Sequence, residues 1–525
     1  MVSANVRDME QIIARTALKY DLLPYASNPF PQTLPSRTGA VARLFGLDAA
    51  PMSRARVLEL GCAAGGNIVP LAHRYPEAKF VGVDLSRTQV AAGRDRIAAL
   101  GLNNIEILCQ SFTELDSSIG TFDYIICHGV YSWVPTLVRD AILRISRERL
   151  SDTGVVYISY NVLPGWRLLQ ALRDSFLLEV PDHTDSKRRV AQARELLAFM
   201  REASPDGGAY KQVLETWQPR LAQLPDDYVA HEFLEEVNEP CTVTDFVRDA
   251  GRHGLAYLGE TEVPGMILDN LLPETARRVR ERSGSNLVAT EQTLDLLTGR
   301  TFRQSLLVAA GRQNEINRNL TPERVTGMHF LCGGGIRVER TGQGGTLTDA
   351  AGRSLSTTSS PVFEALGRVV ARCPASSSIS DMLADLPAAQ REMQPLLQEA
   401  LFKMALCGLM TLSTEPVPAP AGVGERPMAD GLARSDAERR EASTTNLRHE
   451  RVMLDPAALA VLPSLDGTND RVRLAAVLAS QAKAGRLQFS REGTPVNELA
   501  AIDATALAHI DAVLAGIAQA GLLVG

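Results

Sequence analysis

Short apolar runs alternate with longer amphipathic stretches between residues 56 and 160. The apolar runs at 57–60, 79–84, 105–108, 122–127 and 154–160 predict five strands. The stretches 86–100 and 135–150 have the spacing of helices, and Gly101 ends the first of them. Strands that alternate with helices predict an α/β fold with a parallel sheet covered on both faces. The ligand crevice of such a sheet lies at the carboxyl ends of its strands.

The remaining two thirds of the chain predict additions to this sheet. Residues 166–240 read as mostly helical, and strands expected at 255–260 and 301–309 would complete the sheet after this helical insertion. A helix at 394–408 followed by a short strand is compatible with a winged-helix module. The segment 416–429 contains four prolines and two glycines, which is typical of a linker. The expected domains are an arm at 1–50, a core at 51–180, a helical, regulatory insertion at 181–240, completion of the sheet and regulatory region at 241–312, a winged-helix-like α+β module at 313–415, a linker at 416–445 and a small domain at 446–525.

The N-terminal arm contains an amphipathic stretch at 9–20 and then a proline-rich one. Four prolines between Leu23 and Pro35 predict an extended, irregular loop, because proline fixes φ and removes a hydrogen-bond donor. The loop also carries Tyr25 and Phe30. It is either a surface wrap that two aromatic side chains hold in place or a lid over a pocket.

Composition narrows the class of protein. The chain has 525 residues, 45% hydrophobic and 22% charged, and a formal net charge of −7, so a chain that binds nucleic acid along its whole length is not expected. The first twenty residues resemble no signal peptide, and no membrane insertion is expected. Seven scattered cysteines without a CxxC pair favour neither a disulfide framework nor a metal site, and they point to the cytoplasm.

The chemistry centres on a glycine-rich turn after the first strand, Glu59-x-Gly61-x-Ala63-x-Gly65-Gly66. A strand, a glycine-rich turn and a helix form the general nucleotide site. Glu59 would repel a pyrophosphate and attract a cation, while Asp84 at the end of the second strand can accept both ribose hydroxyls. Together they favour S-adenosylmethionine (SAM). The alternatives are a dinucleotide-binding domain and a domain that has lost its ligand.

The chain resembles class I SAM-dependent methyltransferases, and within them a bacterial subgroup with a methyltransferase regulatory domain. Rickettsial protein-lysine methyltransferases that act on an outer-membrane protein have a similar layout. The stretches that carry the resemblance are 24–35, 58–67, 122–135, 160–166, 231–240 and 291–307. Ala63 stands where a glycine is common, and Leu34 where the subgroup has a histidine. The resemblance implies a Rossmann-like sheet with C-terminal winged-helix-like modules.

The resemblance also assigns site residues. The expected cofactor-binding residues are Glu59, Gly61, Cys62, Ala63, Gly65, Asn67, Asp84, Leu85, Gln110, Ser111, Phe112 and His128. The expected catalytic residues are His128, Tyr131, Trp133 and Tyr160, because the end of the fourth strand would face the methyl group. Three of these aromatic residues, with Trp166, could form a wall that attracts an amine by cation–π interaction. Trp133 and Trp166 could equally be core anchors, and His128 either a base or a structural hydrogen-bonding group.

A second group of polar residues lies near the end of the helical insertion. His231, Glu232, Glu235 and Glu236 recur at helical spacing, with Glu239 nearby. They could be metal ligands, an acidic groove for a basic peptide or a solvated helix face.

The sequence therefore predicts a cytoplasmic SAM-dependent methyltransferase that N-methylates lysine side chains of a protein partner. The protein substrate is implied by the resemblance. A small-molecule methyltransferase and a SAM-binding scaffold without turnover are the alternatives. No metal and no nucleic acid are expected, and a homodimer is compatible with the sequence.

Overall fold

The computed structural model describes residues 15, 18, 20–22, 24, 26–181, 185–384, 387–491 and 494–525. Tyr25 and most of the range 9–20, where the sequence predicts an aromatic anchor and a helix, lie outside the described residues.

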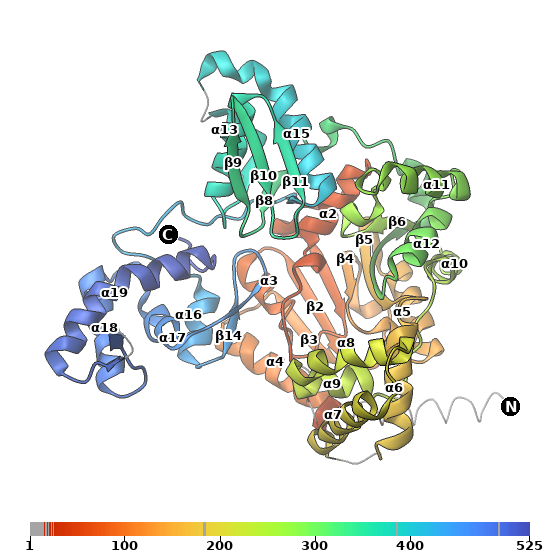
Figure 1. The fold of residues 1–525 in the computed structure, drawn as a ribbon, viewed down its shortest axis with the longest axis horizontal. Helices are drawn as coiled ribbons and strands as arrows, with labels where there is room; N and C mark the ends of the chain where they lie inside the picture. Colours follow the sequence, from red (N-terminus) through yellow and green to blue (C-terminus); the bar gives the residue numbers. More distant parts are fainter. Residues whose placement is uncertain are drawn as a thin grey trace.

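A seven-stranded sheet forms the centre of the molecule (Figure 1). Its strand order is β3-β2-β1-β4-β5-β7-β6. The five strands expected first are confirmed, and the two later strands join the same sheet, as the sequence predicted. Strand β7 runs antiparallel to both β5 and β6, so the sheet is mixed rather than wholly parallel. The strands are β1 (Arg56–Leu60), β2 (Lys79–Asp84), β3 (Ile105–Cys109), β4 (Phe122–Cys127), β5 (Leu150–Asn161), β6 (Leu255–Glu260) and β7 (Phe302–Ala309).

Helices cover both faces of the sheet because successive strand residues point to opposite sides. Val57 packs in the cluster that includes Val41 and Leu71, whereas Leu58 packs with Ile142 and Phe246 in a second cluster. Helices α2, α3 and α4 thus cover one face, and α5 and α10 cover the other. These helices and their neighbours are α2 (Pro35–Leu44), α3 (Val69–Arg74), α4 (Arg87–Ala99), α5 (Thr136–Glu148), α10 (Val243–Arg252), α11 (Pro273–Ser283) and α12 (Leu287–Thr298).

The expected helical insertion lies between β5 and β6. Its helices pack around their own apolar cluster, which includes Trp166, Phe176 and Phe233. In Figure 1 these helices gather below the sheet. They are α6 (Arg167–Glu179), α7 (Ser186–Ala203), α8 (Ala209–Gln223) and α9 (Asp226–Phe233).

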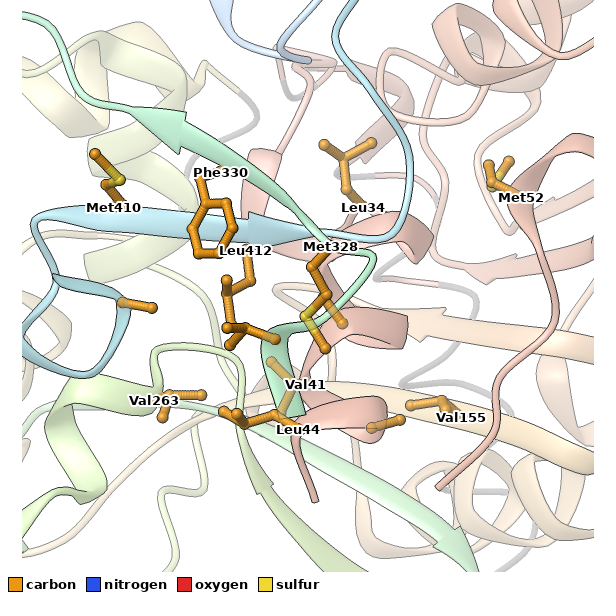
Figure 2. Packing of buried hydrophobic residues seen from close by; sticks show 14 of the residues in the cluster. Leu34, Val41, Leu44, Met52, Val155, Val263, Met328, Phe330, Met410 and Leu412 are labelled. Carbon is orange, nitrogen blue, oxygen red and sulfur yellow. The ribbon is translucent and has the colours of Figure 1, made fainter. Parts of the chain in front are cut away.

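The segment 313–415 forms an α+β module that is continuous with the core through helix α2. Figure 2 shows Val41 and Leu44 of α2 beside Met328, Phe330 and Leu412 of the module, all in one buried cluster. The module contains β8 (His329–Cys332), β9 (Arg337–Thr341), β10 (Gly344–Thr348), β11 (Ser354–Thr357), β12 (Ser377–Ser378), β13 (Met410–Ser413), α13 (Ser360–Ala371), α14 (Ile379–Ala384) and α15 (Gln394–Cys407). The shared cluster explains why the module is fixed to the core.

The C-terminal domain has a separate apolar cluster. Ala429, Ala433 and Ala437 belong to this cluster, so α16 and β14, which lie inside the range expected as a linker, are part of the folded domain. The small apolar side chains of α16 supply the packing face that the linker interpretation overlooked. The elements are α16 (Gly431–Glu438), α17 (Pro456–Val461), α18 (Arg471–Lys483), α19 (Leu499–Gln519), β14 (Ser443–Thr445), β15 (Arg451–Met453), β16 (Ser490–Arg491) and β17 (Thr494–Pro495).

Helix α19 is long and apolar enough, by length and composition, to cross a membrane. Its buried residues Ile502, Ala506, Ile510 and Leu514 recur every four positions and pack in the cluster of the C-terminal domain. This spacing is also that of a core helix in a folded domain, so the length of α19 is weak support for a membrane span.

Candidate functional site

The glycine-rich turn after β1 brings the backbone close to its neighbours. Gly61 has φ of +81°, and a Cβ there would lie 2.4 Å from Cγ2 of Val130, so only glycine fits this position. Ala63, which stands where a glycine is common, also has a positive φ, 49°. The backbone N–H of Gly61 donates to the carbonyl oxygen of Val83 at 2.8 Å, which ties the turn to strand β2.

Glu59 lies beside this turn and is almost completely buried, with 3% of its surface exposed. Its Oε1 accepts a hydrogen bond from Nδ2 of Asn67 at 2.7 Å, whereas its Oε2 has no partner among the described residues. Burial, with a smaller contribution from the nearby Asp84 carboxylate, raises the pKa of Glu59 to about 8. A buried carboxylate oxygen without a partner favours a cationic ligand.

Asp84 ends β2 and is held by the backbone. Its Oδ2 accepts from the N–H of Ala63 at 2.8 Å, and its Oδ1 accepts from the N–H of Ser86 at 2.9 Å. Burial raises the pKa of Asp84, and these backbone hydrogen bonds oppose the rise. The carboxylate is therefore fixed at the strand end.

One cavity of about 960 Å³ brings together most of the predicted cofactor residues. Gly65 is the one predicted cofactor residue that does not line it. Those that line it, here called the loop half, are Glu59, Gly61, Cys62, Ala63, Asn67, Asp84, Leu85, Gln110, Ser111, Phe112 and His128. They follow the carboxyl ends of β1 to β4, where the crevice of such a sheet is expected.

A second group of residues that line the same cavity, here called the tryptophan half, consists of the three tryptophans of the chain and Glu232. The rings of Trp133 and Trp166 lie edge to face, with centroids 6.2 Å apart. Trp217 comes from α8, and Glu232 comes from α9. Burial raises the pKa of Glu232 to about 7, and the charge of Arg173 opposes the rise.

Sequence reasoning did not single out Trp217. A tryptophan on the face of an amphipathic helix has the same pattern whether it packs in a core or lines a cavity. The signal that could have indicated it is rarity, because the chain has only three tryptophans.

The predicted catalytic aromatic residues do not all face this cavity. Tyr131 and Tyr160 are buried in the core against Phe246, with Tyr160 and Phe246 rings stacked at 4.1 Å, and neither lines the cavity. The Tyr160 hydroxyl hydrogen-bonds to Ser305 at 3.2 Å. The expected wall of four aromatic residues is therefore reduced to Trp133 and Trp166, because Tyr131, in the short 3-10 helix Tyr131–Trp133, and Tyr160, in β5, both pack on Phe246 of α10.

His128 lines the cavity and is hydrogen-bonded within the protein. Its Nδ1 lies 2.8 Å from the hydroxyl of Tyr157, and its ring packs on Phe30 with centroids 4.0 Å apart. Burial lowers the pKa of His128 to about 4. The imidazole is neutral at physiological pH.

The polar residues near the end of the helical insertion lie in different surroundings in the structure. Nδ1 of His231 lies 3.1 Å from Oε1 of Glu235, and Glu236 pairs with Arg15 at the surface. Glu232 faces the cavity, as does His231, whose ring stacks on Tyr20. Among the described residues, no group of three or more His, Cys, Asp or Glu side chains is placed to hold a metal ion.

The N-terminal arm lines the same cavity. The hydroxyl of Ser27 accepts from the N–H of Gly66 at 2.7 Å, and the N–H of Ala26 donates to Asp227 of α9 at 3.0 Å. The arm therefore bridges the glycine-rich turn and the helical insertion. This position is compatible with both the surface wrap and the lid.

Three family models match successive parts of the chain: a methyltransferase domain at 57–154, a predicted methyltransferase regulatory domain at 225–309 and a PKMT C-terminal winged helix domain at 425–522. The uncharacterized protein RP789 of Rickettsia prowazekii is 33% identical over 91% of this chain and 88% of its own length. The chain belongs to the SAM-dependent methyltransferases with a regulatory domain.

This methyltransferase also resembles a solved relative over nearly its whole length. The structure of PKMT2 from Rickettsia typhi in complex with AdoHcy has a TM-score of 0.84 and 26% identity, covering 96% of this chain and all of that chain. A second Rickettsia prowazekii relative, the uncharacterized protein RP028, is 34% identical over 44% of the methyltransferase and 94% of its own length. The winged helix match begins at 425, after the module at 313–415 to which the sequence assigned a winged-helix-like fold.

Proposed function

We propose that this methyltransferase transfers the methyl group of SAM to the side-chain nitrogen of lysine residues in a protein. The observation that carries the proposal is that the loop half and the tryptophan half line the same cavity. Among the described residues that line the cavity, three are acidic and one is strongly basic. The acidic residues are Glu59, Asp84 and Glu232, and the basic residue is Arg220. This balance suits two cationic ligands. The likeness to PKMT2 supports the same activity.

The loop half fits SAM. The free Oε2 of Glu59 suits the ammonium of the amino-acid end, and Asp84 suits the ribose hydroxyls. Leu85 and Gln110 to Phe112 line the same cavity, and we assign them to the adenine. SAM supplies an already activated methyl group, so the protein has to position the acceptor more than to supply acid–base chemistry.

The tryptophan half suits an aliphatic amine. Tryptophan rings attract an ammonium and pack on the methylene groups of a lysine side chain. Arg220 lines the same cavity and opposes this attraction, but its guanidinium already lies over the ring of Trp217 at 5.2 Å.

Glu232 is also the better candidate for accepting the proton that the lysine ammonium must lose. A histidine with a pKa near 4, such as His128, is a weak base for an ammonium. Glu232 is partly exposed and lines the cavity, and its pKa is raised to about 7. This value is closer to the pKa of a lysine ammonium than that of His128, so Glu232 is the stronger base. His128 then acts as a hydrogen-bonding group that positions Phe30 and the end of β4.

Methyl transfer from labelled SAM to fractionated cell proteins tests the proposal. We expect label in protein, and we expect prior chemical blocking of lysine amines to abolish it. Label only in the small-molecule fraction would favour the small-molecule alternative, and SAM binding without any label would favour the scaffold alternative.

The cytoplasmic location and the protein partner belong to the same proposal, and a homodimer is compatible with it. Fractionation of cells, followed by detection of the protein, tests the location. Sedimentation of the purified chain tests the homodimer.

A further inference from the structure

A loop of the C-terminal domain, residues 446–450, reaches the region behind the glycine-rich turn. The guanidinium of Arg74, at the end of α3, donates to the carbonyl oxygens of Asn446 and Leu447 at 2.8 and 2.7 Å. His449 in this loop is completely buried and has a left-handed backbone, with φ of +63°. Residues other than glycine adopt this conformation rarely and at some cost, so the surrounding contacts must stabilise it.

The imidazole of His449 contacts a predicted cofactor residue. Its Nε2 lies 2.8 Å from Oδ1 of Asn67. The same Oδ1 accepts a hydrogen bond from the backbone N–H of Phe30 at 2.9 Å, so this atom is the amide oxygen and the histidine nitrogen is the donor. Burial, with the nearby charges of Arg74 and Arg37, lowers the pKa of His449 far below its usual value. The ring is therefore neutral, and its single proton is on Nε2.

Asn67 connects His449 to Glu59 in the proposed SAM site. Its Nδ2 donates to Oε1 of Glu59 at 2.7 Å. A continuous chain of hydrogen bonds thus runs from His449 through Asn67 to Glu59. An amide whose oxygen accepts hydrogen bonds becomes a stronger donor through its nitrogen, so each bond in the chain strengthens the next.

We propose that His449 is a positioning residue for SAM: through it, the docked C-terminal domain holds Asn67 and Glu59 in the arrangement that binds the cofactor. The proposal rests on the proposed function, because it concerns the same site. His449 acts through Asn67 and does not line the cavity.

The coupling is reciprocal. If the docked C-terminal domain strengthens SAM binding, SAM binding strengthens the docking of that domain by the same factor. The C-terminal domain is therefore part of the cofactor site as well as an appended module.

Titration calorimetry of the full chain with SAM tests the role of His449. His449→Gln keeps an N–H donor at the same reach, whereas His449→Met fills a similar volume without one. We expect SAM affinity within about threefold of the original for His449→Gln and about tenfold weaker for His449→Met, the scale of one buried hydrogen bond. Equal affinities for the two variants would overturn the proposal.

Arg96→Met provides a matched control for domain attachment. Nη2 of Arg96 in α4 lies 2.9 Å from both carboxylate oxygens of Asp436 in the C-terminal domain, and Arg96 takes no part in the hydrogen bonds of Asn67. We expect this variant to bind SAM like the original chain. If it weakens SAM binding as much as His449→Met does, general attachment of the domain, and not His449, is responsible.

Hydrogen–deuterium exchange on the unaltered chain tests the coupling without any substitution. We expect SAM to slow amide exchange at 446–450, and unchanged exchange there, with SAM bound, would overturn the proposal even if the His449 variants do not fold. Failure of the unaltered chain to bind SAM at all would instead contradict the proposed function.

Discussion

The loop half and the tryptophan half of the cavity are built in different ways. Apart from the contact of Asn67 with His449, the loop half uses backbone N–H groups and short turns at the ends of adjacent parallel strands, so most of its geometry follows from local spacing. The tryptophan half uses side chains from the end of β4, from the start of α6 and from α8 and α9, which tertiary packing alone brings together. If the loop half binds SAM and the tryptophan half binds the acceptor, as proposed, substitutions in one half should change cofactor binding and acceptor use separately.

The largest expected effect comes from Asp84→Ala in the loop half. Loss of charge-assisted hydrogen bonds to the ribose should weaken SAM binding by roughly 2–4 kcal/mol. Titration calorimetry measures this change, and Asp95→Ala on the exposed face of α4 is the control that should leave SAM binding unchanged. Unchanged SAM affinity in Asp84→Ala would contradict the proposal that Asp84 binds the ribose hydroxyls.

Glu232→Gln tests the tryptophan half separately. The variant loses the carboxylate that is proposed to accept the proton of the lysine ammonium, so kcat should fall by about 100-fold, the low end of what a general base contributes, while SAM affinity stays constant. Steady-state kinetics and SAM titration measure the two quantities. The exposed Glu236→Gln should change neither; a parallel loss of SAM affinity in Glu232→Gln would mean that the two halves are not separable.

Trp133→Leu should have a smaller effect, because leucine keeps apolar bulk and loses only the aromatic face. We expect kcat to fall by a factor corresponding to about 0.5–2 kcal/mol of cation–π attraction. Tyr131→Leu, outside the cavity, should lower the melting temperature and leave the kcat of the folded enzyme unchanged. Full activity in Trp133→Leu would make Trp133 a core anchor only.

The smallest expected effect is a pH dependence of SAM affinity. Glu59 attracts the ammonium of SAM only when it is ionised, so affinity should rise as pH increases through its pKa of about 8. A pKa of this size predicts roughly a fivefold gain in affinity between pH 7 and pH 8, as the ionised fraction grows. Comparison with Glu59→Gln separates this effect from titration of the ligand itself. If SAM affinity depends on pH in the same way in both proteins, Glu59 is excluded as the titrating group.

The sequence predicted the strands, the glycine-rich turn and most of the loop half because these depend on neighbours in the chain. Glu59, Gly61 and Asp84 could be placed from the ends of two strands alone. Tyr131 and Tyr160 could not, because which side of the core an aromatic ring faces depends on α10, a helix about a hundred residues later.

The sequence by itself thus determined the methyltransferase sheet and the chemistry of its cofactor loops, where hydrogen bonds between adjacent segments fix the geometry. Only the tertiary structure decided that Trp217 and Glu232 complete the cavity and that His449 contacts Asn67. Those contacts join residues that are far apart in the chain, and no spacing of hydrophobic and polar positions records such distances.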